Sequence, residues 1–534
     1  MNEISQIPSA KQARSIDLHP LRVTLHQGHQ SIGGALFEVS HRCGNRIILD
    51  LGLPLYESRT QEALNLDWAR LARDPAAGLV QLRRLGIPPP GLGLLQDELP
   101  RLCGAIFITH AHLDHWGLLP FVRDGLRVYC HPVTQRLILW QCLWQGIALP
   151  RLDWHAVNPG DWVRPVQSRP SSEFRVEVIG VEHSVPGALA LRVCAGGREN
   201  GRVIVYSGDL RFDREPEAQI KDAWKLSMRT DLLLVEGTHL GQAASGVLGP
   251  DEAEVGAAVQ RALMAHRGLV TVQASALHQQ RLAYLSRAAR QAGRTLVLDL
   301  YAALTHLAAG GHLRGVRVLF TKDYMRRIEQ RRRQFPDLAK RFMGQDDLQT
   351  CESRRVRLQE IQDEPGAWLL GLRAGMLKDL ERYASKGWAR LPKPELHLHS
   401  LWKGYRRFGD TLEVRLRAQG VPVQDADVHA SGHATADQLR RWAANVGAEQ
   451  TVAVHSAHPE CLSKTARPAL TFNSRRRARA MECFGRRGFT LRDWVGEQVK
   501  VFGKDPTVVK TLALRRGFLD EEVDGALVCQ GINL

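Results

Sequence analysis

Three histidines and one aspartate occur within six residues, directly after an apolar run that is typical of a buried strand. The run is GAIFITH from Gly104, and an HxHxDH pattern places the four side chains at His110, His112, Asp114 and His115. Imidazole nitrogens and carboxylate oxygens are the ligands that zinc takes in proteins. A cluster of this kind beside a buried strand is costly unless a cation holds it, so we favour metal binding over surface histidines on a loop. His110 and His112 can supply one metal, and Asp114 and His115 a second.

Two further candidate ligands also follow strand-like runs. His183 comes after RVEVIGV from Arg175, and Asp209 ends GRVIVYSGD from Gly201. Taken alone, His183 is typical of a core histidine and Asp209 of a turn residue. Their shared position at strand ends, in order after the HxHxDH motif, predicts instead that His183 completes the first metal site and that Asp209 bridges both metals.

The ordered set of these residues resembles the ligands of the metallo-β-lactamase superfamily. In that superfamily an aspartate upstream of the histidine motif, here Asp50 in ILDLG, supports the site from behind its ligands. The resemblance implies an α/β protein with the αββα metallo-β-lactamase fold. The GDL sequence at Asp209 is similar to a phosphoesterase branch, in which an aspartate bridges two metal ions. Two zinc ions roughly 3.5 to 4 Å apart generate hydroxide at neutral pH and neutralise charge on a phosphoryl oxygen; manganese is an alternative to zinc.

Three later motifs resemble those of the β-CASP nucleases, the group that contains ribonuclease J, the cleavage and polyadenylation endonuclease, and Artemis. The motifs are LLLVEGTHL with Glu236, HASGHAT with His433 and VAVHSAHPE with His455. The resemblance implies that His455 ligates the second metal, while His433, paired with Glu236, donates a proton to the leaving oxygen. A histidine held by a carboxylate can be tuned for such work near neutral pH. The implied catalytic residues are Asp114, Asp209, Glu236 and His433.

The same resemblance bears on the substrate. RNA-processing β-CASP members carry histidine at the position of His455, whereas DNA-repair members typically carry an aliphatic residue, so RNA is favoured. The ASALHQQR and SGH segments are similar to the parts of ribonuclease J that hold the terminal 5′ phosphate of RNA. The implied phosphate pocket consists of Ser275, Ser431 and the Gly432 amide. The match departs from the family at Ala276 and Ala434, where asparagine and glycine are usual, so 5′-exonuclease and endonuclease cleavage both stay open.

The elements that must position these residues show two different sequence patterns. Short apolar runs separated by turn residues dominate residues 21–240, and most are apolar on both faces, as strands covered by helices are. At Asp251, with Glu254 in the capping-box position, a helix begins. Helices expected at 275–291 and 301–309 then alternate with strand-like runs, which predicts a parallel sheet.

These two sequence patterns suggest a division of the chain into domains. We expect an N-terminal tail over 1–20, a metallo-β-lactamase domain in two segments, 21–240 and 427–490, and a β-CASP insertion over 241–426. A helical C-terminal tail of unknown role follows at 491–534. The segment from 56 to 99 is longer than a minimal connection, and we expect a lid or a partner surface there.

Composition sets limits on the class of protein. The chain has 534 residues, enough for roughly three domains. Its net charge of +16 favours polyanionic partners such as nucleic acid or an anionic membrane, and charge alone does not choose between them. The resemblance to the β-CASP nucleases implies single-stranded RNA first and DNA second. The sequence contains no apolar run long enough for a membrane helix and no secretion signal at its start, so we expect a cytoplasmic protein without membrane contact. The nine scattered cysteines predict reduced thiols. Oligomeric state is open.

The sequence therefore predicts a ribonuclease that uses two zinc ions, with three alternatives. A β-CASP nuclease acting on DNA shares the same site. A non-catalytic RNA-binding scaffold shares the fold but typically loses ligands, and all expected ligands are present. A small-molecule hydrolase such as a lactonase or thioesterase shares the first motifs but has no use for Glu236, His433 and a large basic insertion.

Overall fold

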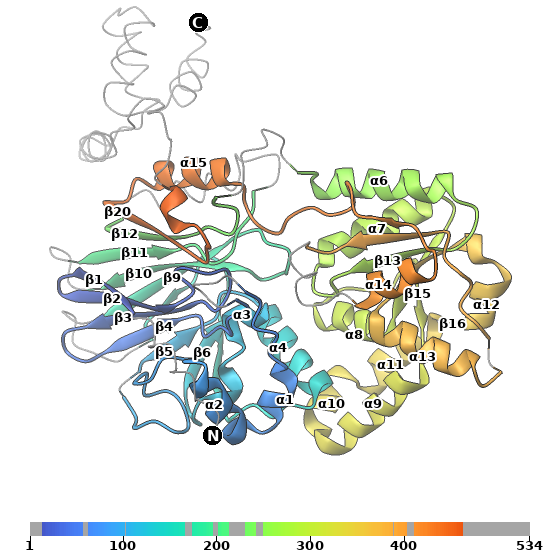
Figure 1. Ribbon diagram of the computed structural model, residues 1–534. Coiled ribbons are helices and arrows are strands. Elements are labelled where there is room, and N and C mark those ends of the chain that lie inside the picture. The colour runs from blue at the N-terminus through green and yellow to red at the C-terminus, as the bar shows by residue number, and fades with distance from the viewer. Residues whose placement is uncertain are drawn as a thin grey trace, which may run out of the picture.

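The structure is a computed structural model that shows two α/β units side by side (Figure 1). It describes residues 13–56, 62–101, 103–165, 173–195, 201–212, 230–241, 249–387, 389–402 and 411–462. The first unit contains two sheets and the second unit one. The predicted C-terminal tail over 491–534 lies outside the described residues.

The first sheet of the first unit has seven strands in the order of the sequence. Its strands are β1 (Arg14–Leu18), β2 (Leu21–Gln27), β3 (Leu36–His41), β4 (Arg46–Leu49), β5 (Ala105–Phe107), β6 (Arg127–Cys130) and β7 (Asp153–Ala156). β1 to β4 form an antiparallel meander, whereas β4 to β7 run parallel. The carboxyl ends of the parallel strands therefore meet at one edge of the sheet.

The second sheet packs face to face on the first. Its order is β20 (Gln450–Val454), β12 (Leu232–Glu236), β11 (Arg202–Tyr206), β10 (Leu189–Ala195), β9 (Phe174–Gly180) and β8 (Trp162–Val163). Apolar side chains of both sheets form one buried cluster, in which the rings of Phe37 and Tyr206 meet edge to face with centroids 5.2 Å apart. This cluster is the centre of a β-sandwich.

Helices cover both outer faces of the sandwich. On the first sheet lie α1 (Trp68–Arg73), α2 (Pro75–Arg84), α3 (Leu113–Trp116) and α4 (Pro132–Gln145), and on the second lies α15 (Ala436–Val446). The predicted αββα fold is thereby confirmed. α1 and α2 bury Trp68 and Leu79 against the core, so this part of the 56–99 segment belongs to the helical layer. A lid or a partner surface in this segment stays a prediction.

The second unit is inserted between two neighbouring strands of the second sheet. The chain leaves after β12 and returns in β20, which pairs with β12 in parallel from Leu232 opposite Gln450 to Glu236 opposite Val454. Between them lies a parallel sheet in the order β16 (Arg355–Val356), β15 (Val316–Leu319), β14 (Thr295–Asp299), β17 (Trp368–Gly371), β13 (Val270–Ala274), β18 (Leu396–Ser400) and β19 (Val423–Gln424). The expected boundaries at 241 and 426 stay predictions.

Helices of the inserted unit pack on both faces of its sheet. They are α6 (Glu252–Ala265), α7 (Gln279–Gln291), α8 (Leu300–Ala308), α9 (Lys322–Gln334), α10 (Pro336–Phe342), α11 (Gln345–Ser353), α12 (Leu358–Asp363), α13 (Ala374–Ala384) and α14 (Thr411–Ala418). The capping box of Asp251 and Glu254 forms as predicted. α7 begins four residues later than expected, because Ser275 to His278 form a turn in which the His278 amide donates to the Ser275 carbonyl. Within the described residues, no helix has the length and apolar character of a membrane span.

An apolar interface joins the two units. Trp140 of α4 is fully buried, and its indole N–H donates to the Thr305 hydroxyl of α8 across 2.8 Å. The Trp144 ring lies tilted against Tyr301 of α8 with centroids 5.0 Å apart, and the Trp144 carbonyl accepts from Arg331 of α9. One contiguous cluster of buried side chains runs through this contact, so the units share a core.

Replacing Trp140 with alanine should therefore destabilise the whole protein. A buried Trp→Ala change typically costs about 3–5 kcal/mol of unfolding free energy. The matched control is Trp162→Ala, which removes a half-exposed indole and should cost about 1 kcal/mol or less. Urea unfolding of both variants checks this; equal midpoints would contradict a shared core.

Candidate metal centre and active site

The candidate ligands lie at the carboxyl ends of strands from both sheets. His110, His183 and Asp209 each come three residues after the last residue of β5, β9 and β11 (107 to 110, 180 to 183 and 206 to 209). Glu236 ends β12, and His455 directly follows β20. Because the ends of these strands meet at one edge of the sandwich, residues separated by more than 300 positions become neighbours.

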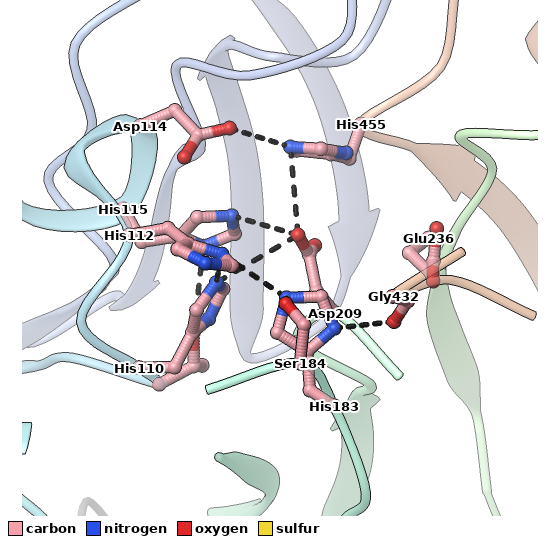
Figure 2. Close-up of polar contacts among 12 residues, drawn as sticks. His110, His112, Asp114, His115, His183, Ser184, Asp209, Glu236, Gly432 and His455 are labelled. Atoms are coloured by element: carbon pink, nitrogen blue, oxygen red, sulfur yellow. Dashed lines mark hydrogen bonds and ion pairs between the residues drawn. The ribbon is translucent and has the colours of Figure 1, made fainter. Parts of the chain in front are cut away.

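The first group of candidate ligands contains three imidazoles and one carboxylate. His112 Nδ1 lies 3.1 Å from both His110 Nε2 and His183 Nε2, and His110 Nε2 lies 3.8 Å from Asp209 Oδ2. One ring nitrogen of each of these three histidines points toward the other rings of the group (Figure 2). One potential ligand atom from each of these four residues lies within 4.8 Å of the others, so the group can hold one metal ion.

The second group contains Asp114, His115 and His455. His455 Nε2 lies 3.1 Å from Asp114 Oδ2, and His115 Nε2 lies 3.2 Å from Asp209 Oδ2. Asp209 Oδ2 is also 3.8 Å from His455 Nε2, which puts this one oxygen between the two groups. All seven predicted ligands are thus brought together around Asp209; their binding of metal stays a prediction.

The chemistry of these donors fits divalent cations. Two nitrogens bound to one tetrahedral zinc at about 2.05 Å each are roughly 3.3 Å apart, close to the spacing of the first group. His115 Nε2 and Asp209 Oδ1 are buried and have no hydrogen-bond partner among the described residues. Orphaned buried polar atoms are rare in folded proteins and point to a missing ion or water.

Protonation states favour metal binding in the first group. Burial lowers the pKa of His112 to about 4, and burial with neighbouring imidazoles lowers the pKa of His110 and His183 well below the usual value. These three rings are therefore neutral at pH 7, which is the state that ligates metal. In the second group, burial opposes ionisation of Asp114, but the imidazoles of His115 and His455 together outweigh burial and lower the pKa of Asp114 to about 2.

Asp50 lies behind His115 and belongs to neither group. Its carboxylate accepts from His115 Nδ1 at 2.8 Å, from the Thr109 amide at 2.7 Å and from the Tyr206 hydroxyl at 2.7 Å. The first contact leaves His115 Nε2 as the nitrogen that faces Asp209. Asp50 and His455 both have positive φ, at 58° and 52°, which is uncommon for residues other than glycine and typical of functional sites.

A histidine–carboxylate pair borders the two groups. His433 Nδ1 lies 3.1 Å from Glu236 Oε1 and 3.8 Å from Asp209 Oδ2. Burial alone would lower the pKa of His433, but the carboxylates of Glu236, Asp209 and Asp114 together outweigh burial and raise the pKa to about 9. The imidazole is therefore protonated at neutral pH and can donate a proton.

Thr238 contributes contacts that sequence reasoning missed. Its hydroxyl lies 3.1 Å from His433 Nδ1 and 3.0 Å from His455 Nδ1, and its amide donates to Glu236 Oε2 at 3.1 Å. The contact with His455 leaves Nε2 of that ring facing Asp114. The sequence signal that could have identified Thr238 is its position two residues after Glu236 in the EGTHL motif.

The residues of the predicted phosphate pocket are only partly gathered. Ser431 and Gly432 precede His433, and the Gly432 carbonyl accepts from His183 Nδ1. A Cβ on Gly432 would lie 2.8 Å from Ser184 Oγ, so glycine is required for this approach. Ser275 lies in the turn before α7, and among the described residues it makes no hydrogen bond to Ser431 or Gly432. A single pocket of these three residues stays a prediction.

Comparison with known proteins gives sequence relatives for part of the chain. Residues 70–278 match the family model of the "Beta-lactamase superfamily domain". Ribonuclease J of Mycobacterium tuberculosis (strain ATCC 25618 / H37Rv) is 30% identical over 213 residues, which are 38% of this chain and 35% of that protein. Ribonuclease TTHA0252 of Thermus thermophilus is 30% identical over 147 residues, or 26% of this chain and 33% of that protein. The matched regions therefore span about a third of these relatives.

A solved structure resembles most of the chain. A protein of unknown function from Enterococcus faecalis V583 aligns with 84% of this chain and 96% of its own length, at 17% sequence identity and a TM-score of 0.59. This similarity establishes a shared fold across both the sandwich and the insertion. At this identity it says nothing about function.

The shared position of Asp209 makes it the most informative residue for a test of metal binding. Asp209→Ala should weaken binding at both groups, by more than the roughly 10- to 100-fold that loss of an outer contact costs. Metal analysis by mass spectrometry after equilibration with limiting zinc measures this. Glu236→Gln, outside both groups, is the control and should retain wild-type metal; equal metal in Asp209→Ala and wild type would refute the assignment.

Proposed function

Because this chain is a metallo-β-lactamase-fold protein related to ribonuclease J, we propose that it is a zinc-dependent ribonuclease that hydrolyses phosphodiester bonds of RNA. The observation that carries the proposal is the position of Asp209 Oδ2, which lies within 3.8 Å of nitrogens from the first ligand group, from the second ligand group and from His433. A two-metal arrangement with an adjacent acid suits an in-line displacement at phosphorus.

The chain's own residues have separate tasks in this proposal. His110, His112, His183 and Asp209 would hold one zinc, and Asp114, His115 and His455, with Asp209, would hold the other. When bound, the two ions supply an activated water and neutralise charge on the phosphoryl group. Asp50 orients His115, and Thr238 orients His455.

The leaving oxygen needs a proton, and His433 is in position to supply it. Protonated His433 is held by Glu236 on one ring nitrogen, which leaves Nε2–H free to donate. The ring stacks beside His455 at 5.8 Å and meets His183 edge on at 5.0 Å, so it borders both metal groups. A proton donor at the edge of the two ligand groups can serve the departing oxygen.

The substrate is assigned from charge and from the relatives. A net charge of +16 supplies non-specific affinity for phosphates that weakens with salt. The named relatives are ribonucleases, and histidine at position 455 is the residue of RNA-processing β-CASP members in the resemblance stated above. We therefore assign the inserted unit as a β-CASP domain and the substrate as single-stranded RNA, in keeping with the predicted cytoplasmic location.

Matched oligonucleotides test the substrate directly. Single-stranded RNA and DNA of one sequence, each with a 5′-monophosphate or a 5′-hydroxyl and a 3′ label, should show cleavage of RNA alone. Stepwise shortening of the 3′-labelled RNA from its monophosphate end indicates a 5′-exonuclease, and discrete products of internal cleavage indicate an endonuclease. Asp114→Ala should bind RNA but not cleave it; preferential cleavage of DNA would overturn the RNA assignment.

His433→Gln tests the proton donor separately from the metals. Loss of a general acid typically costs about 10²- to 10⁴-fold in rate, so the variant should cleave RNA that much more slowly. Its zinc content should equal that of the wild type, because His433 is in neither ligand group. A wild-type rate in this variant would remove His433 from the mechanism.

A further inference from the structure

Two buried arginines and one buried glutamate connect the inserted unit to the candidate active site. Arg281 of α7, Glu252 of α6 and Arg211, which follows Asp209 by two positions, are at most 5% exposed. We call these three residues the Arg281 network. Buried charges are stable only when paired and fully hydrogen-bonded, so each contact in this network is informative.

Arg281 uses all three of its guanidinium nitrogens. Nε and Nη2 form a bidentate pair with Glu252 at 2.6 and 2.9 Å. Nη1 donates to the Ser400 hydroxyl at the end of β18. Nη1 and Nη2 also donate to the carbonyls of Val428 and Ala430, at 3.4 and 3.1 Å.

The two carbonyls that Arg281 contacts belong to the segment that returns from the inserted unit. This segment, residues 427–435, carries Ser431, Gly432 and His433 and forms neither helix nor strand. The Val428 and Ala430 carbonyls therefore have no partner in a helix or sheet and accept from side-chain donors instead. The Ser400 hydroxyl, itself contacted by Arg281, also donates to the Val428 carbonyl.

Arg211 connects the same glutamate to the metal-ligand loops. Its guanidinium lies 3.2 Å from Glu252 and 3.0 Å from Glu182, the residue before His183, and it also contacts Gln280 of α7. The Arg211 amide donates to the Glu182 carbonyl at 2.8 Å. The loops that carry Asp209 and His183 are thereby joined to α6 and α7.

We propose that the Arg281 network is a positioning device, through which the inserted unit sets the distance between His433 and the metal ligands Asp209 and His183. Arg281 fixes the His433 segment, Arg211 fixes the ligand loops, and Glu252 binds both arginines. The kinetic part of this inference rests on the proposed function. None of the three side chains needs to touch substrate, so they are positioning residues.

Arg294 provides a matched control for a buried arginine without this connection. It is 7% exposed and donates to the backbone carbonyls of Gly268, Leu263 and Trp368, all within the inserted unit. Arg281→Met and Arg294→Met therefore remove the same group from the same unit. Only the first change should affect the His433 segment.

Hydrogen–deuterium exchange provides a readout that does not depend on activity. The amides of His433 and Ala434 donate to Ser431 Oγ and to the Leu210 carbonyl, so their exchange reports on the position of the segment. In zinc-loaded full-length protein, Arg281→Met should accelerate exchange across residues 428–434, and Arg294→Met should not. Equal exchange in the two variants would overturn the proposal.

Kinetics test the consequence for catalysis. Misplacement of a catalytic group by about 1 Å can cost about 10²-fold in rate, so Arg281→Met should lower kcat for RNA cleavage by that order with little change in KM and in zinc content. Arg281→Lys, which keeps the charge near Glu252, should recover part of kcat. Ser400→Ala provides a milder variant with the same pattern if Arg281→Met does not fold; loss of kcat equal to that in Arg294→Met would refute a positioning role.

The two proposals fail in distinguishable ways. If wild-type protein does not cleave RNA but exchange in residues 428–434 rises only in Arg281→Met, the proposed function is wrong and the network stands. If wild-type protein cleaves RNA and the Arg281 and Arg294 variants behave alike, the network is wrong and the proposed function stands.

Discussion

The desolvation of the cluster around Asp209 is the constraint on which the rest of the structure depends. Histidine and aspartate side chains from five separate stretches of chain converge there, and most are buried. Without a cation, the imidazoles of His110, His112 and His183 would be neutral groups with facing lone pairs, and Asp209 Oδ1 would have no hydrogen-bond partner among the described residues. Such an arrangement is costly unless divalent cations provide the missing interactions. Rigid strand ends and the contacts of Asp50 keep the donors in place.

The insertion point follows from the same constraint. β12 ends at Glu236 and β20 leads directly into His455, and these strands are hydrogen-bonded neighbours. A unit placed between them can be large without separating these two residues, because both strands remain in the sandwich. The returning segment must pass the metal-ligand loops before α15, which brings His433 beside Glu236. The topology thus allows a second unit to be added while its connection supplies part of the site.

The sequence predicted most of the strands and every member of the ligand cluster, because both have local signals. Apolar runs with a histidine or aspartate at their ends are visible without a structure. The helix α4 was not predicted, because its apolar residues lie on several faces. The structure shows why: α4 packs on its own sheet and, through Trp140 and Trp144, on the inserted unit. The start of α7 was placed too early because a turn held by Ser275 resembles a helix cap. The contacts of Thr238, Arg211 and Arg281 could not be predicted, since each depends on segments that are distant in sequence.

The candidate metal ligands and the contacts around His433 come from different parts of the fold. The candidate metal ligands come from the sandwich, whereas the environment of His433 depends on the sandwich through Glu236 and Thr238 and on the inserted unit through the contacts of Arg281 with Val428 and Ala430. The inserted unit also contacts the loops of Asp209 and His183, through the ion pair of Glu252 with Arg211. Changes at Arg281 that leave this ion pair in place can therefore alter the position of His433 without removing a candidate ligand, because the buried apolar interface through Trp140 keeps the two units in a fixed relation. A fixed interface, with adjustment confined to one returning segment, lets the position of His433 vary while the seven candidate ligands stay in place.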